Sequence, residues 1–476
     1  MSADTVIKAD IAIIGAGSGG LSVAAGAAQM GAKTVLIEKG KMGGDCLNYG
    51  CVPSKALIAA GEAAETVRTS GKFGVNGHEP SIDFAEVNGH VHDVIGGIAP
   101  HDSVERFEGL GVQVIQAAGR FVGPKEIEAG GYRIRARRFV ISTGSSAFIP
   151  PIPGLDKTPF LTNETVFSLT DRPDHLIIVG GGPIGIELAQ AHRRLGVKVT
   201  VVEGFGIMGK DDLDAVEVVR KRLIAEGIEL MEGSKVESVV QSGNGVSVLV
   251  SKDGRTSPID GSHLLVAVGR RAHVDGLGLD EAGIDYSPHG ITVDARLRTS
   301  NKKVFAIGDV AGGYQFTHVA GYHASIVIKN ALFNLPSKTD ERAVPWVTYT
   351  DPEIAQVGLT EAKAEEQGVL VRASTFAFAE NDRARAERAT EGFVKAVVGK
   401  RGKILGATIV GRHAGELILP WVLAVQKGLK IADMAGLIAP YPTLGEASKR
   451  AAGAYFAPTL FSERTRKVVG LMQYLP

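Results

Sequence analysis

The sequence predicts an α/β protein with two Rossmann-like domains and a C-terminal α+β domain. Two observations carry this prediction: a strand–glycine turn–helix–strand unit occurs twice, and the remaining chain alternates strands and helices without a third such unit. The composition agrees. A chain of 476 residues suggests about three domains, and its 61 glycines are nearly twice the usual ~7 %.

The first unit begins near the N-terminus. An apolar run at residues 10–14 is typical of a buried strand and leads directly into Gly15, Gly17 and Gly20. A helical stretch follows, and then a second strand that ends in Glu38. Such glycines let the backbone turn and approach a pyrophosphate, helix amides bind it, and the acid accepts a hydrogen bond from a ribose hydroxyl. The unit is therefore predicted to bind a dinucleotide.

The second unit repeats the first. A strand at residues 176–179 precedes Gly180, Gly182 and Gly185, and the next strand ends in Glu203. The acid lies 23 residues after the first glycine in both units. Two dinucleotides are therefore implied; the alternative is one working site and one relic. A carboxylate at position 203 accepts from a free 2′-hydroxyl and repels a 2′-phosphate, so NAD(H) is favoured over NADP(H).

Three later strands end in turns suited to close approach of a ligand. The first leads into Thr143, Gly144 and Ser145, the second into Gly269, and the third into Asp309. Prolines after residue 149 and a polar connector at 335–344 mark boundaries. The expected domains are residues 1–150 with 275–340, residues 151–274, and residues 341–476. In the last we expect strands at 391–398 and 404–410 and a helix at 417–427.

Composition also excludes classes of function. Lys plus Arg and Asp plus Glu number 52 each, so no long-range field attracts nucleic acid. The uncharged stretch 11–32 is long enough to cross a bilayer, but repeated glycines interrupt it and no cleavage site follows a basic leader. We expect a cytoplasmic protein with no integral membrane segment and no nucleic-acid partner.

The two cysteines, Cys46 and Cys51, lie within six residues. So short a loop makes a poor structural staple, whereas a cytosolic thiol pair suits thiol–disulfide exchange. The alternative is that both cysteines are incidental buried residues. A zinc site would need two more ligands nearby, and these are missing, so no metal site is expected. Lys55 follows Cys51 by one helical turn, which places its ammonium on the same face as the thiolate.

The string from Gly43 to Lys55, GGDCLNYGCVPSK, resembles the redox motif of the flavin-dependent pyridine nucleotide-disulfide oxidoreductases. That family includes dihydrolipoyl dehydrogenase, glutathione reductase and mercuric reductase. Further motifs follow in family order across nearly the whole chain, at residues 143–145, 180–187, 306–309 and 351–355.

The resemblance implies that the first unit binds FAD, that the second binds the nicotinamide cofactor, and that the C-terminal domain forms the interface of a homodimer. The residues expected at FAD are Gly15, Gly17, Gly20, Glu38, Lys55, Gly119, Thr143, Gly144, Ser145, Asp309 and His318. Those expected at NAD are Gly180, Gly182, Gly185, Glu203 and Gly269.

The resemblance also implies roles for the catalytic residues. Electrons pass from NAD(P)H through the flavin to the Cys46–Cys51 disulfide and on to an acceptor. In the family pattern Cys51 faces the flavin, Cys46 meets the substrate, and Lys55 pairs with Glu187.

The chain departs from the family near its C-terminus. Members acting on small thiols usually carry His-Pro-Thr-x-x-Glu, but here Tyr441 replaces the histidine while Glu446 keeps its place, five residues on, where it can orient an imidazole at 441. A tyrosine, with an ordinary pKa near 10, is a poor base at neutral pH. Mercuric reductases resemble this chain in having that tyrosine, but they add a C-terminal cysteine pair that is missing after Cys51. His318 is a candidate substitute proton donor, with a structural histidine as the alternative.

Three functions follow from these residues. The first is an FAD- and NAD(H)-dependent disulfide oxidoreductase whose acceptor is a metal ion, a disulfide or a quinone-like compound. The second is a dihydrolipoyl dehydrogenase acting on a lipoyl carrier protein. The third, a flavoprotein with mainly a binding role, is disfavoured by the intact Cys46, Cys51 and Lys55. The basic and apolar C-terminal tail is expected to pack on the dimer partner, with docking to a membrane surface as the alternative.

Overall fold

The computed structural model describes residues 5–473 and divides the chain into two compact units. The first comprises residues 1–204 and 230–339, and the second residues 205–229 and 340–476. Residues 205–229, expected in the second dinucleotide-binding domain, thus cluster with the C-terminal part. The three-domain boundaries remain predictions, and their ends at 1–4 and 474–476 lie outside the described residues.

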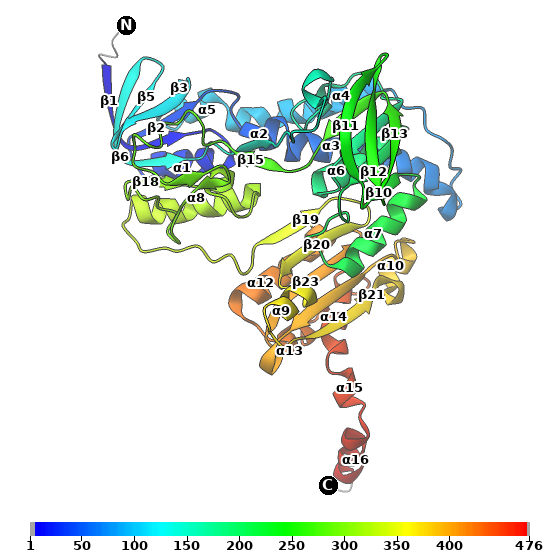
Figure 1. The fold of residues 1–476 in the computed structure, drawn as a ribbon. Helices are drawn as coiled ribbons and strands as arrows, with labels where there is room; N and C mark the ends of the chain where they lie inside the picture. Colours follow the sequence, from blue (N-terminus) through cyan, green and yellow to red (C-terminus); the bar gives the residue numbers. More distant parts are fainter. Residues whose placement is uncertain (1–4, 474–476) are drawn as a thin grey trace. The chain divides into compact units, whose positions relative to one another are not determined.

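The first unit is built on a seven-stranded sheet in the order β3-β2-β1-β6-β5-β4, with β18 also paired to β6 (Figure 1). Its central strand β1 runs parallel to both β2 and β6. The strands are β1 (Thr5–Ile14), β2 (Thr34–Glu38), β3 (Val112–Gln116), β4 (Gly119–Gly123), β5 (Glu126–Ala129), β6 (Tyr132–Ile141) and β18 (Val304–Ala306).

Both faces of β1 are covered, which explains its continuous apolar run. Ile11 and Ile13 pack with helices α1 (Ser18–Gln29) and α8 (Thr317–Ala331). Ala12, on the opposite face because side chains alternate along a strand, packs in a second cluster with residues of β4 to β6. The C-terminal ends of the parallel strands are thereby held rigidly where the glycine turns begin.

A second parallel sheet in the same unit has the order β10-β9-β8-β14, with β8 paired in parallel to β9 and β14. Its strands are β8 (His175–Val179), β9 (Lys198–Glu203), β10 (Glu229–Glu232) and β14 (His263–Val266). Between β10 and β14 in the sequence, three strands form a separate antiparallel sheet. They are β11 (Lys235–Ser242), β12 (Gly245–Lys252) and β13 (Arg255–Gly261). Helix α6 (Pro183–Arg194) follows β8 and packs against α3 (Cys51–Thr69).

The two glycine turns have the same geometry. Gly15 has φ +102°, and a Cβ there would lie 2.4 Å from the carbonyl oxygen of Ser142. Gly180 has φ +112°, and a Cβ there would lie 2.4 Å from the carbonyl oxygen of Ala267. Any side chain at either position would meet both backbone strain and a clash, so the sequence repeat corresponds to a structural repeat.

A two-stranded antiparallel ribbon connects the segments that follow the other two glycine turns. Strand β7 (Ser145–Ala147) comes after Gly144, and β15 (Arg270–Ala272) comes after Gly269. They pair so that Arg270 lies opposite Ala147. This pairing brings Arg270 beside the end of the large sheet.

The second unit contains a five-stranded antiparallel sheet in the order β19-β20-β23-β22-β21. Its strands are β19 (Pro345–Thr348), β20 (Glu353–Gly358), β21 (Arg372–Ala377), β22 (Phe393–Val398) and β23 (Ile404–Gly411). Helices α12 (Leu419–Lys427) and α14 (Glu446–Ala454) pack on it through the buried Trp421, whose indole donates to Ser448. The expected strands at 391–398 and 404–410 and the helix at 417–427 are confirmed.

Helix α7 (Leu213–Ala225) also belongs to the second unit and packs on β20 and β23. Lys395 on β22 is buried and donates to both carboxylate oxygens of Asp212, each at 2.9 Å, and to Asp214 at 2.5 Å. Asp212 also accepts from the first amides of α7 as its N-cap. One lysine therefore ties the start of α7 to the sheet.

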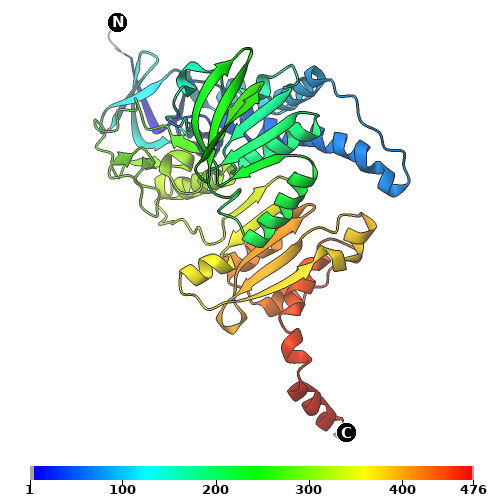
Figure 2. The ribbon, with the colours of Figure 1, turned by 45° about the vertical axis from the view of Figure 1, so that its right-hand side comes forward.

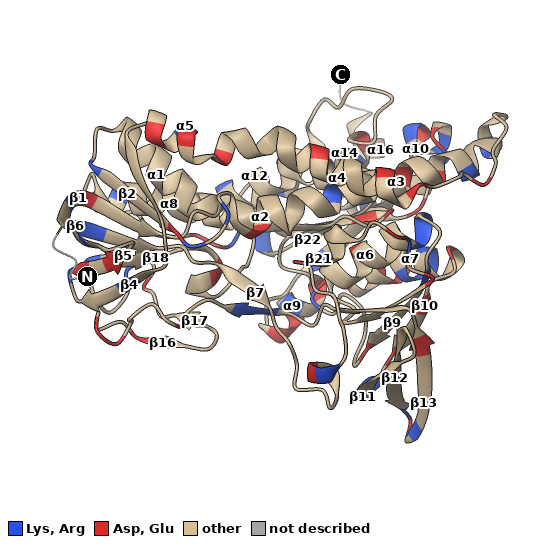
Figure 3. Cartoon of the chain, turned by 90° about the horizontal axis from the view of Figure 1, so that it is seen from above, with Lys and Arg blue, Asp and Glu red and all other residues tan. Residues whose placement is uncertain are grey.

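The chain ends in two short helices, α15 (Ala457–Leu460) and α16 (Glu463–Met472), which project from the rest of the second unit in both views (Figures 1 and 2). None of the ten residues of α16 is buried. Acidic and basic residues are interspersed over the elements rather than gathered by sign (Figure 3). Within residues 5–473 no helix has both the length and the apolar character needed to cross a membrane.

Candidate active site

The cysteine pair sits at the junction of two helices. Cys46 lies in α2 (Gly44–Asn48) and is half-buried, while Cys51 is the first residue of α3 and is exposed; both are thiols. The sulfur of Cys51 lies 3.5 Å from the hydroxyl oxygen of Thr317, at the start of α8. This contact joins the cysteine helices to the segment that follows Asp309.

The two thiols have opposite acid–base character. The hydrogen bond from the Cys46 thiol lowers the pKa of Cys51 to about 6, with further help from Thr317 and the charge of Lys55. The same hydrogen bond, together with burial, raises the pKa of Cys46 well above its ordinary value. These shifts favour the thiolate at Cys51 and the protonated thiol at Cys46.

Lys55 and Glu187 form an ion pair, with 2.8 Å between Nζ and Oε2. Glu187 lies on α6, five residues after Gly182, and its side chain is only 7 % exposed. The pairing expected from the family pattern is thus present in the structure. It orients the ammonium of Lys55 towards the helix of the second glycine fingerprint.

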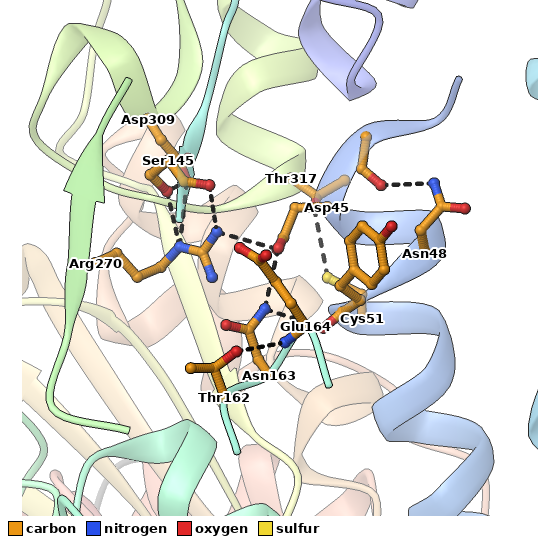
Figure 4. Close-up of polar contacts among 12 residues, drawn as sticks. Asp45, Asn48, Cys51, Ser145, Thr162, Asn163, Glu164, Arg270, Asp309 and Thr317 are labelled. Carbon is orange, nitrogen blue, oxygen red and sulfur yellow. Dashed lines mark hydrogen bonds and ion pairs between the residues drawn. The ribbon is translucent and has the colours of Figure 1, made fainter. Parts of the chain in front are cut away.

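A polar network lies next to the cysteines (Figure 4). Ser145 donates to Asp309 at 2.5 Å, and Arg270 donates through Nε to the hydroxyl of Ser145 at 2.7 Å. The other end of the guanidinium forms an ion pair of 3.1 Å with Asp45, the residue before Cys46. Burial raises the pKa of the Asp309 carboxyl, although Ser145 and Arg270 oppose this effect.

The first glycine fingerprint fits FAD. Gly17 is the N-cap of helix α1 and makes no side-chain cap, and a Cβ there would come no closer than 4.0 Å to its nearest neighbour, leaving room beside the helix N-terminus. Glu38 accepts from the amide of Ala16 at 2.6 Å and from Gly40 at 2.7 Å, which fixes the carboxylate where the family resemblance places the ribose. Gly119 is buried, and a Cβ there would lie 3.0 Å from Ile37, next to Glu38.

The second fingerprint has the same arrangement. The amide of Gly181 donates to Glu203 at 2.7 Å, as Ala16 does to Glu38. A Cβ at Gly182, the residue before α6, would meet nothing within 4 Å. The requirements for a second dinucleotide, an open helix N-terminus and a fixed carboxylate, are therefore met.

The remaining first-unit candidates lie around these centres. Thr143 donates to the carbonyl of His273, and Gly144 and Gly269 have φ of +71° and +128° at the turns before the β7–β15 ribbon. His318 is exposed on the first turn of α8, next to Thr317, and its ring stacks on Phe316 with centroids 5.2 Å apart.

Tyr441 and Glu446 lie in the second unit but do not bond to each other. Tyr441 is 69 % exposed and donates its hydroxyl to Asp382 at 2.9 Å, which raises the pKa of the tyrosine. Glu446 begins α14 and pairs with Arg450 at 2.9 Å. The hydrogen-bond partner of the Tyr441 hydroxyl is therefore Asp382, while Glu446 acts on Tyr441 through its charge.

Sequence reasoning did not identify Asp45, Asn163, Arg270, Thr317 and Asp382. Thr317 and Arg270 reach the site only through the folding of α8 and the pairing of β15, and neither belongs to a spaced motif. Asp45 had one signal: it is a carboxylate directly before a redox-type cysteine, where its charge opposes thiolate formation.

Fold and site together define an oxidoreductase that binds two dinucleotides beside a reactive thiol pair. The family model for pyridine nucleotide-disulphide oxidoreductases matches residues 9–324, and the model for the dimerisation domain of these enzymes matches residues 344–452. The chain therefore belongs to the pyridine nucleotide-disulphide oxidoreductase family.

Relatives with curated names support this membership. A mercuric reductase of Bacillus cereus is 36 % identical over 445 residues, which cover 93 % of this chain and 70 % of the relative. A dihydrolipoyl dehydrogenase of Geobacillus stearothermophilus is 36 % identical over 458 residues, 94 % of this chain and 96 % of the relative.

Solved structures are also similar. The HOCl-induced flavoprotein disulfide reductase RclA of Escherichia coli, in a Cu(II) complex, has a TM-score of 0.83 and 27 % identity over 92 % of this chain and 98 % of RclA. LpdA of Mycobacterium tuberculosis has a TM-score of 0.85 and 30 % identity over 94 % of this chain and 99 % of LpdA. These findings confirm the predicted family and fold class: the chain is a flavoprotein disulfide oxidoreductase of a family that binds FAD and a pyridine nucleotide.

Proposed function

We propose that this enzyme oxidises NADH and delivers the electrons through the Cys46–Cys51 pair to a thiophilic metal ion as its substrate. The observation that carries the proposal is Tyr441, which is bonded to Asp382 at the position where family members acting on small thiols carry a histidine. Bound FAD supplies the two-electron exchange between the nicotinamide and the disulfide. Lys55, paired with Glu187, holds positive charge beside the thiolate.

The choice of acceptor rests on proton supply. A disulfide acceptor needs an acid to protonate the departing thiolate, whereas a metal ion takes electrons without receiving a proton. Tyr441 is a weak acid whose hydroxyl is bonded to Asp382, so it serves the first chemistry poorly. The names of the mercuric reductases and the Cu(II) complex of RclA support the same substrate class.

The other parts of the proposal rest on further residues. Glu203, fixed by the amide of Gly181, supports NADH over NADPH because its charge repels a 2′-phosphate. The match to a dimerisation domain at residues 344–452 supports a homodimer. We place the enzyme in the cytoplasm, where a dithiol stays reducible.

An anaerobic assay tests this function. NADH oxidation is followed with Cu(II), Hg(II), lipoamide, glutathione disulfide and a quinone, each with the wild type and with Cys46→Ser. We expect the fastest turnover with a metal ion, and loss of it in Cys46→Ser. Turnover of lipoamide and of no other acceptor would contradict the metal-ion proposal and favour a dihydrolipoyl dehydrogenase instead.

That second candidate is a dihydrolipoyl dehydrogenase acting on a lipoyl carrier protein. It is favoured by the 36 % identity to the Geobacillus enzyme across 96 % of that enzyme's length. In this case the carrier or a water molecule supplies the base that the replaced histidine would have provided. Assay with a lipoylated carrier domain in place of free lipoamide separates the two functions.

A further inference from the structure

We propose that Arg270 is a positioning residue that fastens the Cys46 helix to the FAD site and offsets the charge of Asp45 beside the thiolate. The inference rests on the proposed function, because it concerns the same thiol pair. Its evidence is the geometry of Arg270, Asp45, Ser145 and Asp309 (Figure 4).

Arg270 bridges two segments that are distant in the sequence. Its side chain is 13 % exposed and donates to the hydroxyl and the carbonyl of Ser145, at 2.7 and 2.8 Å. The same guanidinium lies 3.7 Å from Asp309 and 3.1 Å from Asp45. A planar fork with several donors can hold such a set in fixed directions, which the point charge of a lysine cannot.

Asp45 is held from a second side. The buried amide of Asn163 donates to Asp45 at 3.0 Å and to the carbonyl of Tyr49 at 3.1 Å. A Cβ at Gly50 would lie 2.9 Å from the Asp45 carboxylate, so this carboxylate rests against the residue before Cys51. The α2 segment is therefore clamped between Asn163 and Arg270, with a negative charge fixed close to both cysteines.

The charges around Cys51 show why that carboxylate needs a partner. The thiolate faces Cys46 and Asp45 from α2, Lys55 on its own helix with Glu187 behind it, and Thr317 from α8. Asp45 opposes the thiolate and Lys55 favours it. Arg270 pairs with Asp45 without touching the sulfur, so its removal would leave the charge of Asp45 unopposed near the thiolate.

The test compares four variants: Arg270→Met, Arg270→Lys, Asp45→Asn and the double variant Arg270→Met/Asp45→Asn. The holoenzyme is reduced with dithiothreitol, freed of excess reductant under anaerobic conditions, and alkylated with iodoacetamide across pH 5–9. The rate at Cys51 is read by peptide mass spectrometry. No nicotinamide or metal ion is added, so the result is independent of whether the proposed acceptor is correct.

We expect the alkylation midpoint to rise by about one pH unit in Arg270→Met, because the charge of Asp45 is then unopposed. It should fall in Asp45→Asn and return close to wild type in the double variant. Arg270→Lys should restore the midpoint only in part. FAD should also dissociate faster from Arg270→Met, since Ser145 loses its donor and Asp309 loses its ion pair.

Arg271→Met is the matched control. Arg271 is the next residue of β15, 53 % exposed, and pairs with Asp275 at the surface at 2.9 Å, so its removal should leave the midpoint and FAD retention unchanged. A wild-type midpoint in Arg270→Met, or a shift in the same direction for Arg270→Met and Asp45→Asn, would overturn the proposal. The second result would indicate a general loosening of the loop rather than charge compensation.

Discussion

Lys55 and Glu187 are joined by a 2.8 Å ion pair that connects the helix of the cysteines to the helix of the second glycine fingerprint. The carboxylate is nearly buried while the ammonium keeps contact with solvent. The pair therefore holds a positive charge that favours the thiolate of Cys51 and ties it to the helix of the second glycine fingerprint.

The first prediction concerns the charge-transfer band between the thiolate and the flavin. Reduction by two electron equivalents should produce a long-wavelength absorbance, because the thiolate of Cys51 is stabilised by Cys46, Thr317 and Lys55. Cys51→Ser should lack the band, and Cys46→Ser should show it without reduction. A Cys46→Ser spectrum without this band would contradict the assignment of Cys51 to the flavin and Cys46 to the substrate.

The same band should depend on pH. The thiolate is the form present above the pKa of a thiol, and the pKa of Cys51 is lowered to about 6. The absorbance of the two-electron-reduced wild type should therefore rise through about pH 6 and stay level from pH 7 to 8. A midpoint near 8.5, the ordinary value for a thiol, would show that the surroundings do not stabilise the anion.

The third prediction tests Glu203. Glu203→Ala should reduce kcat/KM for NADH by about 10- to 100-fold, since a charge-assisted hydrogen bond is worth roughly 1.5 to 3 kcal/mol, and should lessen discrimination against NADPH. Glu203→Gln is the control, because it keeps an acceptor for the Gly181 amide but loses the charge. A wild type that already prefers NADPH would contradict the cofactor assignment.

The fourth prediction concerns position 441. Tyr441→His should increase turnover of dihydrolipoamide or a small disulfide, because an imidazole is a better acid–base group at neutral pH than a tyrosine whose hydroxyl is bonded to Asp382. General acid–base catalysis contributes roughly 10²- to 10⁴-fold, so even part of that gain is measurable. Tyr441→Phe is the comparison. Rapid dihydrolipoamide turnover by the wild type, unchanged in Tyr441→Phe, would place the base elsewhere.

The fifth prediction is about stability. Lys395 is 5 % exposed and is bonded to the equally buried Asp212, so Lys395→Met should lower the free energy of unfolding by about 3 to 5 kcal/mol. Denaturant unfolding followed by circular dichroism measures this change. Lys221→Met is the control, because Lys221 is 75 % exposed and its pair with Glu217 is 3.6 Å long; such surface pairs contribute about 0–1 kcal/mol.

The glycine fingerprints could be predicted because their requirements are local. A residue with positive φ pressed against a carbonyl, such as Gly15 or Gly180, has to be glycine in any sequence that folds this way. The positions of the acids at 38 and 203 could be predicted because each ends the strand after its glycine turn. The two cysteines could be predicted as a pair because only four residues separate them. The fold class was therefore readable from short windows of the chain.

The rest of the site depends on tertiary pairing that no short window contains. Arg270 approaches Asp45 only because β15 pairs with β7, and Thr317 meets Cys51 across 266 residues. Tyr441 bonds to Asp382, which lies 59 residues earlier in the chain. Spacing rules describe helices and strands, and these contacts are made between elements.

Helix α16 has a consequence for how the protein can be handled. A ten-residue helix that buries none of its own side chains within one subunit has only a partner subunit to hold it, since isolated helices shorter than about 12 residues are marginal in water. Where the partner does not cover α16, a protease added in trace amounts should thus cut first near residues 456–462, between α14 and α16. The trimmed subunit should keep both glycine fingerprints and the thiol pair, so its yellow colour and its reduced spectrum should survive digestion.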